Sequence, residues 1–166
     1  MYQHLSHTLP IFINEQSKYI ILGSFPSVKS REVMFYYGHP RNKFFPILFK
    51  VFNEEHSFDA SRRKEFLIKH EIALYDVIEE CDIEGSSDSS ITNVKPANIV
   101  SILKKYPNIK VIGITGGKAA KLFNRYLLDL VSSFNIKIVY LPSTSPANAR
   151  ISDEALVEAY KSLLCF

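Results

Sequence analysis

Two short segments of the sequence combine aromatic rings with basic and amide side chains. Residues 23–27 read Gly-Ser-Phe-Pro-Ser, and residues 35–45 read Phe-Tyr-Tyr-Gly-His-Pro-Arg-Asn-Lys-Phe-Phe. Rings that stand beside guanidinium groups are suited to stacking on a nucleobase and to contacting phosphate. Aromatic side chains are more often core residues, so we expect about half of these rings to be buried. The rings concerned are Phe25, Tyr36, Tyr37 and Phe45.

Two polar side chains lie next to predicted elements. Asp76 ends the apolar run 72–76, where it could act as a general base or, equally, accept a hydrogen bond from a loop N–H. Asn42 could cap a helix over residues 43–52, with Pro46 in its first turn.

Several kinds of catalytic and metal site are excluded by their missing patterns. The sequence has no GxSxG turn, its histidines show no HxH or HExxH spacing, and residues 113–118 are too short for a Walker A loop. Gly116 and Gly117 are instead expected to form a tight turn between a strand and a helix. Cys81 and Cys165 are too few for a four-cysteine metal site or a disulfide framework. We therefore expect no metal and no cofactor.

The composition is that of one globular domain spanning residues 1–166. The chain is 46% apolar and 22% charged, with a net charge of +3, which excludes disorder as the main state. It contains no apolar run near the roughly 20 residues of a membrane span, and residues 1–10 lack the features of a signal peptide. We expect a protein of the reducing cytoplasm that does not contact membranes.

Charge is unevenly distributed along the chain. Residues 104–125 hold six basic side chains and no acidic one, whereas residues 71–88 hold seven acidic side chains and no Lys or Arg. A basic face would attract phosphates. Charge alone favours the alternative, a set of ordinary solvated helix faces.

Short apolar runs alternate with segments of helical spacing. Strands are predicted at 18–23, 72–76, 109–114 and 136–141, and helices at 43–52, 61–69, 96–106, after Gly117 and at 152–163. Residues 23–42 are expected to form a long loop or broken helix. The alternation predicts a parallel sheet covered on both faces, with ligands bound beyond the carboxyl ends of its strands. The loop after Gly23, the turn at 115–118 and the loop at 142–148 would meet there.

Six motifs in this order resemble the uracil-DNA glycosylase superfamily. The similarity is greatest to its hypoxanthine-DNA (deoxyinosine) glycosylase family, with the mismatch-specific uracil-DNA glycosylases close behind. It covers most of the chain and rests on residues 23–27, 36–42 with 44–45, 72–77, 81–89, 116–119 and 141–147. The resemblance implies a three-layer α/β/α fold around a central four-stranded parallel sheet, and a monomer.

The resemblance also implies a monofunctional enzyme of base excision repair. Such an enzyme flips a deaminated base out of DNA and hydrolyses its N-glycosidic bond. Cleavage builds positive charge on the sugar and negative charge on the base, so the protein must offer donors to the base and hold water near the sugar. No lysine stands where a Schiff-base nucleophile is indicated, so we expect no lyase step.

Individual roles follow where the motifs match. Asn42 corresponds to the catalytic asparagine of the hypoxanthine family, where its amide would orient water or donate to the departing purine. Capping is the alternative, and both roles can coexist. The base pocket would be formed by Gly23, Ser24, Phe25, Pro26, Tyr37, Phe45 and Asp76. The DNA backbone would be contacted by Ser27, Arg41, Lys118, Ser143 and Ser145.

Four residues depart from the family pattern. Ser24 and Phe25 stand where most of the superfamily has a catalytic Asn or Asp, and Leu141 stands where many relatives have His or Asn. Because uracil cleavage depends on those groups, we expect hypoxanthine to be preferred, with uracil or xanthine weaker. Thr115 stands where relatives commonly have Asn, directly before the two glycines. The departures leave two alternatives open: a catalytically silent nucleic-acid-binding domain of the same fold, and a hydrolase of free nucleosides or nucleotides.

Overall fold

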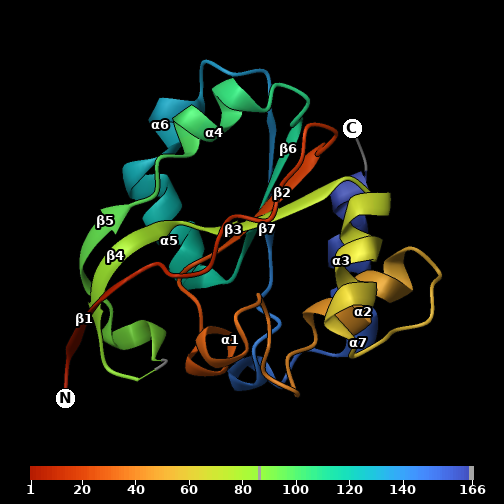
Figure 1. The fold of residues 1–166 in the computed structure, drawn as a ribbon, viewed down its shortest axis with the longest axis horizontal. Coiled ribbons are helices and arrows are strands. Elements are labelled where there is room, and N and C mark those ends of the chain that lie inside the picture. Colours follow the sequence, from red (N-terminus) through yellow and green to blue (C-terminus); the bar gives the residue numbers. More distant parts are fainter. Residues whose placement is uncertain (86, 165–166) are drawn as a thin grey trace.

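A four-stranded parallel sheet forms the centre of the computed structural model, which describes residues 1–85 and 87–164 (Figure 1). In spatial order its strands are β3 (Ile72–Asp76), β2 (Tyr19–Gly23), β6 (Val111–Thr115) and β7 (Lys137–Leu141). All neighbouring pairs are parallel and in continuous register. The predicted α/β fold is confirmed, and each predicted strand is found within two residues of its expected bounds.

Helices cover both faces of this sheet because alternate strand residues point in opposite directions. Ile21 and Leu74 belong to the core beneath one helix layer, whereas Ile20 and Ile112 belong to the core beneath the other. The first layer holds α2 (Phe44–Val51), α3 (Ala60–Lys69) and α7 (Asp153–Lys161). The second holds α4 (Ile99–Lys105), α5 (Gly117–Tyr126) and α6 (Leu128–Val131). Strands buried on both faces must be apolar throughout, which made them recognisable in the sequence.

The segment between β2 and α2 contains a short helix, α1 (Val28–Val33). Ser27 caps it by accepting the Ser30 N–H at 3.1 Å, and Met34 ends it in the left-handed conformation. This agrees with the broken helix expected there. Short 3₁₀ turns occur at η2 (Pro146–Asn148) and η3 (Ser162–Leu164).

A second, antiparallel sheet was not predicted. It consists of β1 (Gln3–Ser6), β4 (Ile78–Ile83) and β5 (Thr92–Pro96), in the order β1-β4-β5, with η1 (Asp88–Ser90) between β4 and β5. The chain passes from β3 directly into β4 at Val77. Most residues of β1 and β5 are exposed or half-buried, so these strands lack the apolar pattern that identifies a buried strand.

The predicted helix start at Pro96 is wrong. Pro96 ends β5, and α4 begins at Ile99 after Asn98, whose side chain accepts the Ser101 N–H at 3.1 Å. Proline is compatible with the end of an edge strand as well as with the first turn of a helix. Pairing with β4 therefore decided which of the two forms.

Within the described residues, none of the helices is both long and apolar enough to cross a bilayer. The same residues contain no group of three or more His, Cys, Asp or Glu side chains that could hold a metal ion. Cys81 is a buried free thiol, and Cys165 lies outside the described residues.

Candidate functional site

The carboxyl ends of three neighbouring strands form the floor of a pocket. Gly23 ends β2, Asp76 ends β3 and Thr115 ends β6, and all three line the cavity. The connection after β2 leads to β3 on one side, and the connection after the neighbouring β6 leads to β7 on the other. Parallel sheets bind ligands where neighbouring connections diverge in this way. The cavity measures about 130 Å³. This is close to the roughly 150 Å³ of a protein cavity that holds one benzene ring, so the pocket is on the scale of an aromatic ring rather than of a whole nucleotide.

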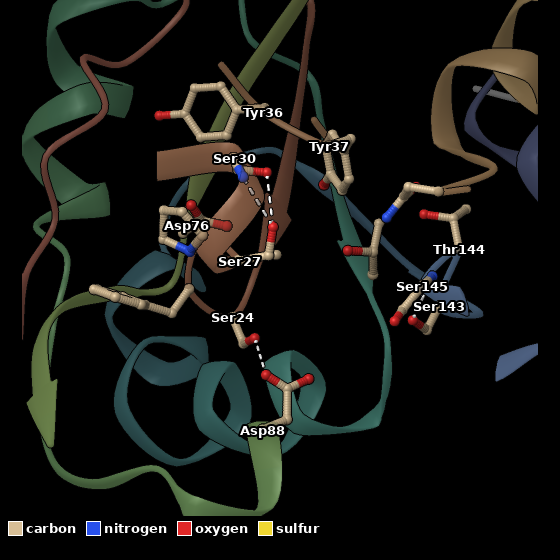
Figure 2. Close-up of a pocket in the computed structure, with 15 residues that line it drawn as sticks. Ser24, Ser27, Ser30, Tyr36, Tyr37, Asp76, Asp88, Ser143, Thr144 and Ser145 are labelled. Atoms are coloured by element: carbon tan, nitrogen blue, oxygen red, sulfur yellow. Dashed lines mark hydrogen bonds between the residues drawn. The ribbon is translucent and has the colours of Figure 1, made fainter. Parts of the chain in front are cut away.

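Most of the predicted site residues meet in this pocket (Figure 2). Those that line it are Gly23, Ser24, Phe25, Pro26, Ser27, Tyr37, Asn42, Asp76, Ser143 and Ser145. The three segments expected to converge at the sheet edge therefore do so. Ser30, Tyr36, Asp88, Thr115 and Thr144 also line it. Tyr36 was one of the four rings suited to stacking on a base, and the other four side chains were not assigned a role at the site.

The prediction of Phe45 as a pocket residue is wrong. Its ring is 1% exposed and lies in the core, stacked on Phe35 with ring centroids 6.0 Å apart and edge-on to Phe44 at 5.1 Å. Helix α2 turns this ring away from the cavity. Phe25 and Tyr36 are also buried, but they line the pocket from the core side.

Arg41 and Lys118 do not line the pocket. Arg41 is exposed, and Lys118 is half-buried at the start of α5, close enough to Asp88 to influence its pKa. Contact of these two side chains with a DNA backbone stays a prediction.

Tyr37 presents its ring to the pocket from a constrained backbone. Its φ is 54°, a left-handed conformation that is uncommon for an aromatic residue. The ring stacks on Phe44 at a centroid distance of 3.7 Å. Burial, with Asp76 nearby, raises the pKa of the hydroxyl, and the Thr115 side chain partly opposes this. The hydroxyl therefore stays protonated, and it has no well-formed hydrogen bond within the described residues.

Asp76 is paired with a histidine that sequence reasoning did not select. His7 Nε2 lies 2.8 Å from Asp76 Oδ2, and the two side chains are 0% and 6% exposed. His7 follows β1 directly, and its N–H donates to the Glu79 carbonyl at 2.7 Å. The unpredicted antiparallel sheet therefore carries His7 to the pocket floor. The partner of Asp76 is a side chain rather than the loop N–H considered above.

Asn42 lies one residue before the N-cap of α2, which is Lys43, and it lines the pocket. Its Oδ1 accepts the N–H of Phe44, the first residue of α2, at 2.8 Å. Because that backbone group can only donate, the amide orientation is fixed, and the two N–H donors of Nδ2 remain. The backbone N–H of Lys43, which lies between Asn42 and Phe44, donates to the Thr144 carbonyl at 3.0 Å. The predicted hydrogen bond from the helix start to Asn42 is present, although the N-cap itself is Lys43, and the catalytic role stays a prediction.

The serine hydroxyls of the loop after β7 accept hydrogen bonds from backbone N–H groups of the same loop. Ser143 Oγ accepts the Ser145 N–H at 3.1 Å, and Ser145 Oγ accepts the Ala147 N–H at 3.2 Å. A hydroxyl that accepts one hydrogen bond can still donate its proton. The neighbouring turn places Gly116 at φ 87°, with its N–H donating to the Leu141 carbonyl at 2.9 Å. This confirms the predicted glycine turn.

A second carboxylate reaches the pocket from η1. Ser24 Oγ donates to Asp88 Oδ1 at 2.8 Å (Figure 2). Although Asp88 is exposed as a residue, burial of its carboxyl raises its pKa, with Asp76 adding to the effect and Ser24 and Lys118 opposing it. Asp88 lies within one of the motifs noted in the sequence, residues 81–89, but no rule of spacing connects it to Ser24.

Replacing His7 with leucine is expected to destabilise the fold by roughly 3–5 kcal/mol, since it leaves one partner of a buried pair alone. Denaturation in urea measures this loss. His4→Leu is the matched control, because His4 is 60% exposed in its pairing with Asp82, and an exposed pair contributes at most about 1 kcal/mol. Equal, small losses in both variants would show that the His7–Asp76 contact does not support the pocket floor.

Comparisons with known proteins agree with this geometry. Residues 10–164 match the pattern of the uracil DNA glycosylase superfamily. A protein of Methanosarcina acetivorans named hypoxanthine DNA glycosylase is 31% identical over 144 residues, which are 86% of this chain and 88% of that protein. A protein of Methanosarcina barkeri with the same name is 35% identical over 143 residues, 85% of this chain and 87% of that protein.

The fold has a solved counterpart. The solution NMR structure of a Methanosarcina acetivorans protein described as a candidate uracil DNA glycosylase matches with a TM-score of 0.78. The two sequences are 25% identical, and the match covers 99% of both chains. The match therefore spans all of the backbone segments that form the pocket in this chain.

Proposed function

The chain belongs to the uracil DNA glycosylase superfamily, and from this premise we propose that it is a DNA glycosylase that removes hypoxanthine from DNA. The observation that carries the proposal is a pocket on the scale of an aromatic ring, at the carboxyl ends of the strands, with Asn42 among its lining residues. The enzyme flips the damaged nucleotide into this pocket and hydrolyses its N-glycosidic bond as a step of base excision repair.

Asp76 suits recognition of a deaminated purine. Hypoxanthine carries an N–H at position 1, whereas adenine carries a bare acceptor nitrogen there. A carboxylate at the pocket floor accepts from the first and repels the second. His7 holds Asp76 Oδ2, which leaves Oδ1 beside Gly23 to face the base. Tyr37 provides an aromatic face for stacking.

The leaving base needs hydrogen-bond donors as negative charge develops on it. The Nδ2 group of Asn42 supplies two donors in the pocket wall, and the backbone amides of residues 24–27 supply others. Asn42 Oδ1 is already held by α2. Because the amide oxygen is already bonded to the helix, the amide nitrogen is the part of Asn42 that can serve the base, as a donor.

Two buried apolar side chains support a preference for hypoxanthine over uracil and xanthine. Phe25 is 9% exposed and Leu141 is 4% exposed, and neither offers a polar group where relatives commonly have one.

We further propose that the DNA backbone is contacted by Ser27, Arg41, Lys118, Ser143 and Ser145. The proposal also includes a monomeric enzyme that works in the cytoplasm without a cofactor.

A panel of labelled duplexes tests the proposal. Each duplex carries deoxyinosine, deoxyuridine, deoxyxanthosine or only normal bases, and is treated with alkali after incubation with excess enzyme. We expect cleavage at deoxyinosine, weaker cleavage at the other deaminated bases, and no strand break before alkali. Comparable turnover of deoxyuridine would contradict the preference, and strand breaks without alkali would contradict the monofunctional mechanism.

Two other outcomes would select the alternative functions. Salt-sensitive DNA binding without release of any base would indicate a silent nucleic-acid-binding domain. Efficient hydrolysis of free inosine would indicate a nucleoside hydrolase instead.

A further inference from the structure

Hydrolysis of an N-glycosidic bond needs more than donors to the base. Positive charge develops on the sugar, and a water molecule must be held beside it and lose a proton. Phe25 is apolar, and the Asn42 amide is neutral with its oxygen already bonded to Phe44. Another group must therefore supply the negative charge. Among the described residues that line the pocket, the carboxylates are Asp76 and Asp88.

These two carboxylates occupy different depths of the pocket. Asp76 is 4% exposed, lies at the floor and is bonded to the buried His7. Asp88 is exposed on η1, so it lies at the mouth. Figure 2 shows them on opposite sides of Ser24. When a flipped base fills the floor, its sugar remains at the mouth, on the side of Asp88.

The Asp88 carboxylate is also held in place through one of its two oxygens, which leaves the other available. Its Oδ1 accepts the Ser24 hydroxyl at 2.8 Å, which fixes the carboxylate against the loop after β2. Within the described residues, Oδ2 makes no hydrogen bond. A fixed carboxylate with one open oxygen can hold a water molecule.

We propose that Asp88 is a second catalytic residue, whose carboxylate faces the sugar of the flipped nucleotide, stabilises its positive charge and accepts a proton from the attacking water. This inference rests on the proposed glycosylase function. The bond between C1′ and the base nitrogen breaks, and its electron pair leaves with the base. The water oxygen bonds to C1′, one water proton passes to Asp88, and that proton then neutralises the departed base through solvent.

The electrostatic surroundings suit this role. Burial raises the pKa of the Asp88 carboxyl, so it takes up a proton more readily than an ordinary aspartate. Lys118 and Asp76 are the charged groups that act on it, in opposite directions. Its negative charge at the mouth also repels DNA phosphates. Removing that charge should therefore slow the chemistry without weakening DNA binding.

The Asp88→Asn variant provides the test, since the amide oxygen can still accept from Ser24. We expect single-turnover cleavage of a deoxyinosine duplex to fall by about 10²-fold, with DNA affinity unchanged or higher. Glu84→Gln is the control, because it removes one negative charge from the same loop at a side chain that is 55% exposed and outside the pocket. Its cleavage rate is expected to stay within about twofold of the unmodified protein.

Ser24→Ala gives a second, independent variant. It keeps the Asp88 charge but removes its anchor, so cleavage should slow while DNA binding holds. A cleavage rate for Asp88→Asn close to that of the unmodified protein would overturn the proposal. So would a loss explained wholly by weaker DNA binding. Failure of the unmodified protein to release any base would instead refute the proposed function itself.

Discussion

Replacing Asn42 with aspartate is expected to slow the release of hypoxanthine by about 10²–10³-fold while leaving helix α2 intact. The aspartate keeps an oxygen that accepts the Phe44 N–H at the start of α2. It loses both N–H donors and places a negative charge beside a base that is itself becoming negative. Single-turnover cleavage of a deoxyinosine duplex measures the effect.

The same variant should not lose stability. A negative charge at a helix N-terminus contributes about 0.3–1 kcal/mol through the helix dipole, so urea denaturation should show equal or higher stability. Asn42→Ala is the complementary control, because it removes both the cap and the donors. It is expected to lose about 1 kcal/mol of stability as well as activity. Full activity in Asn42→Asp would limit Asn42 to capping.

Replacing Gly23 with alanine is expected to reduce cleavage by about 10²-fold, the scale of loss that a displacement of 1 Å can cause. A Cβ at this position would lie 2.7 Å from Asp76 Oδ1. A carbon and an oxygen atom that are not bonded to each other cannot lie this close, so either the Asp76 side chain or the backbone at residue 23 must shift. Either change disturbs the His7–Asp76 pair and the place of the base. Cleavage rates and urea denaturation together measure the two effects.

Gly117→Ala is the matched control for Gly23→Ala. Gly117 begins α5 after the neighbouring strand, and a Cβ there would meet no atom within 4 Å. Alanine favours the helix by about 0.5–1 kcal/mol, so stability should rise and cleavage should not change. Normal cleavage in Gly23→Ala would show that the base does not reach the floor of the pocket.

The local pattern of the sequence was sufficient for the central sheet and the edge where the pocket lies. Strands β2, β3 and β6 are nearly continuous apolar runs, because both of their faces are covered, whereas the edge strand β7 exposes Lys137 and Tyr140. The hydrogen bond between Asn42 and the start of α2, and the turn at Gly116, were also predictable, since each depends on neighbours within a few residues. Interactions of this range leave a readable signature in the sequence.

Only the tertiary structure decided which side chains meet in the pocket. The two contacts that complete it, His7 with Asp76 and Ser24 with Asp88, join residues 69 and 64 positions apart. Both depend on the antiparallel sheet, whose largely exposed outer strands carry no apolar signal. Likewise, helix α2 places Phe45 in the core, whereas Tyr37, in the segment before that helix, lines the pocket. The packing of whole elements decides such contacts, and local periodicity carries no information about it.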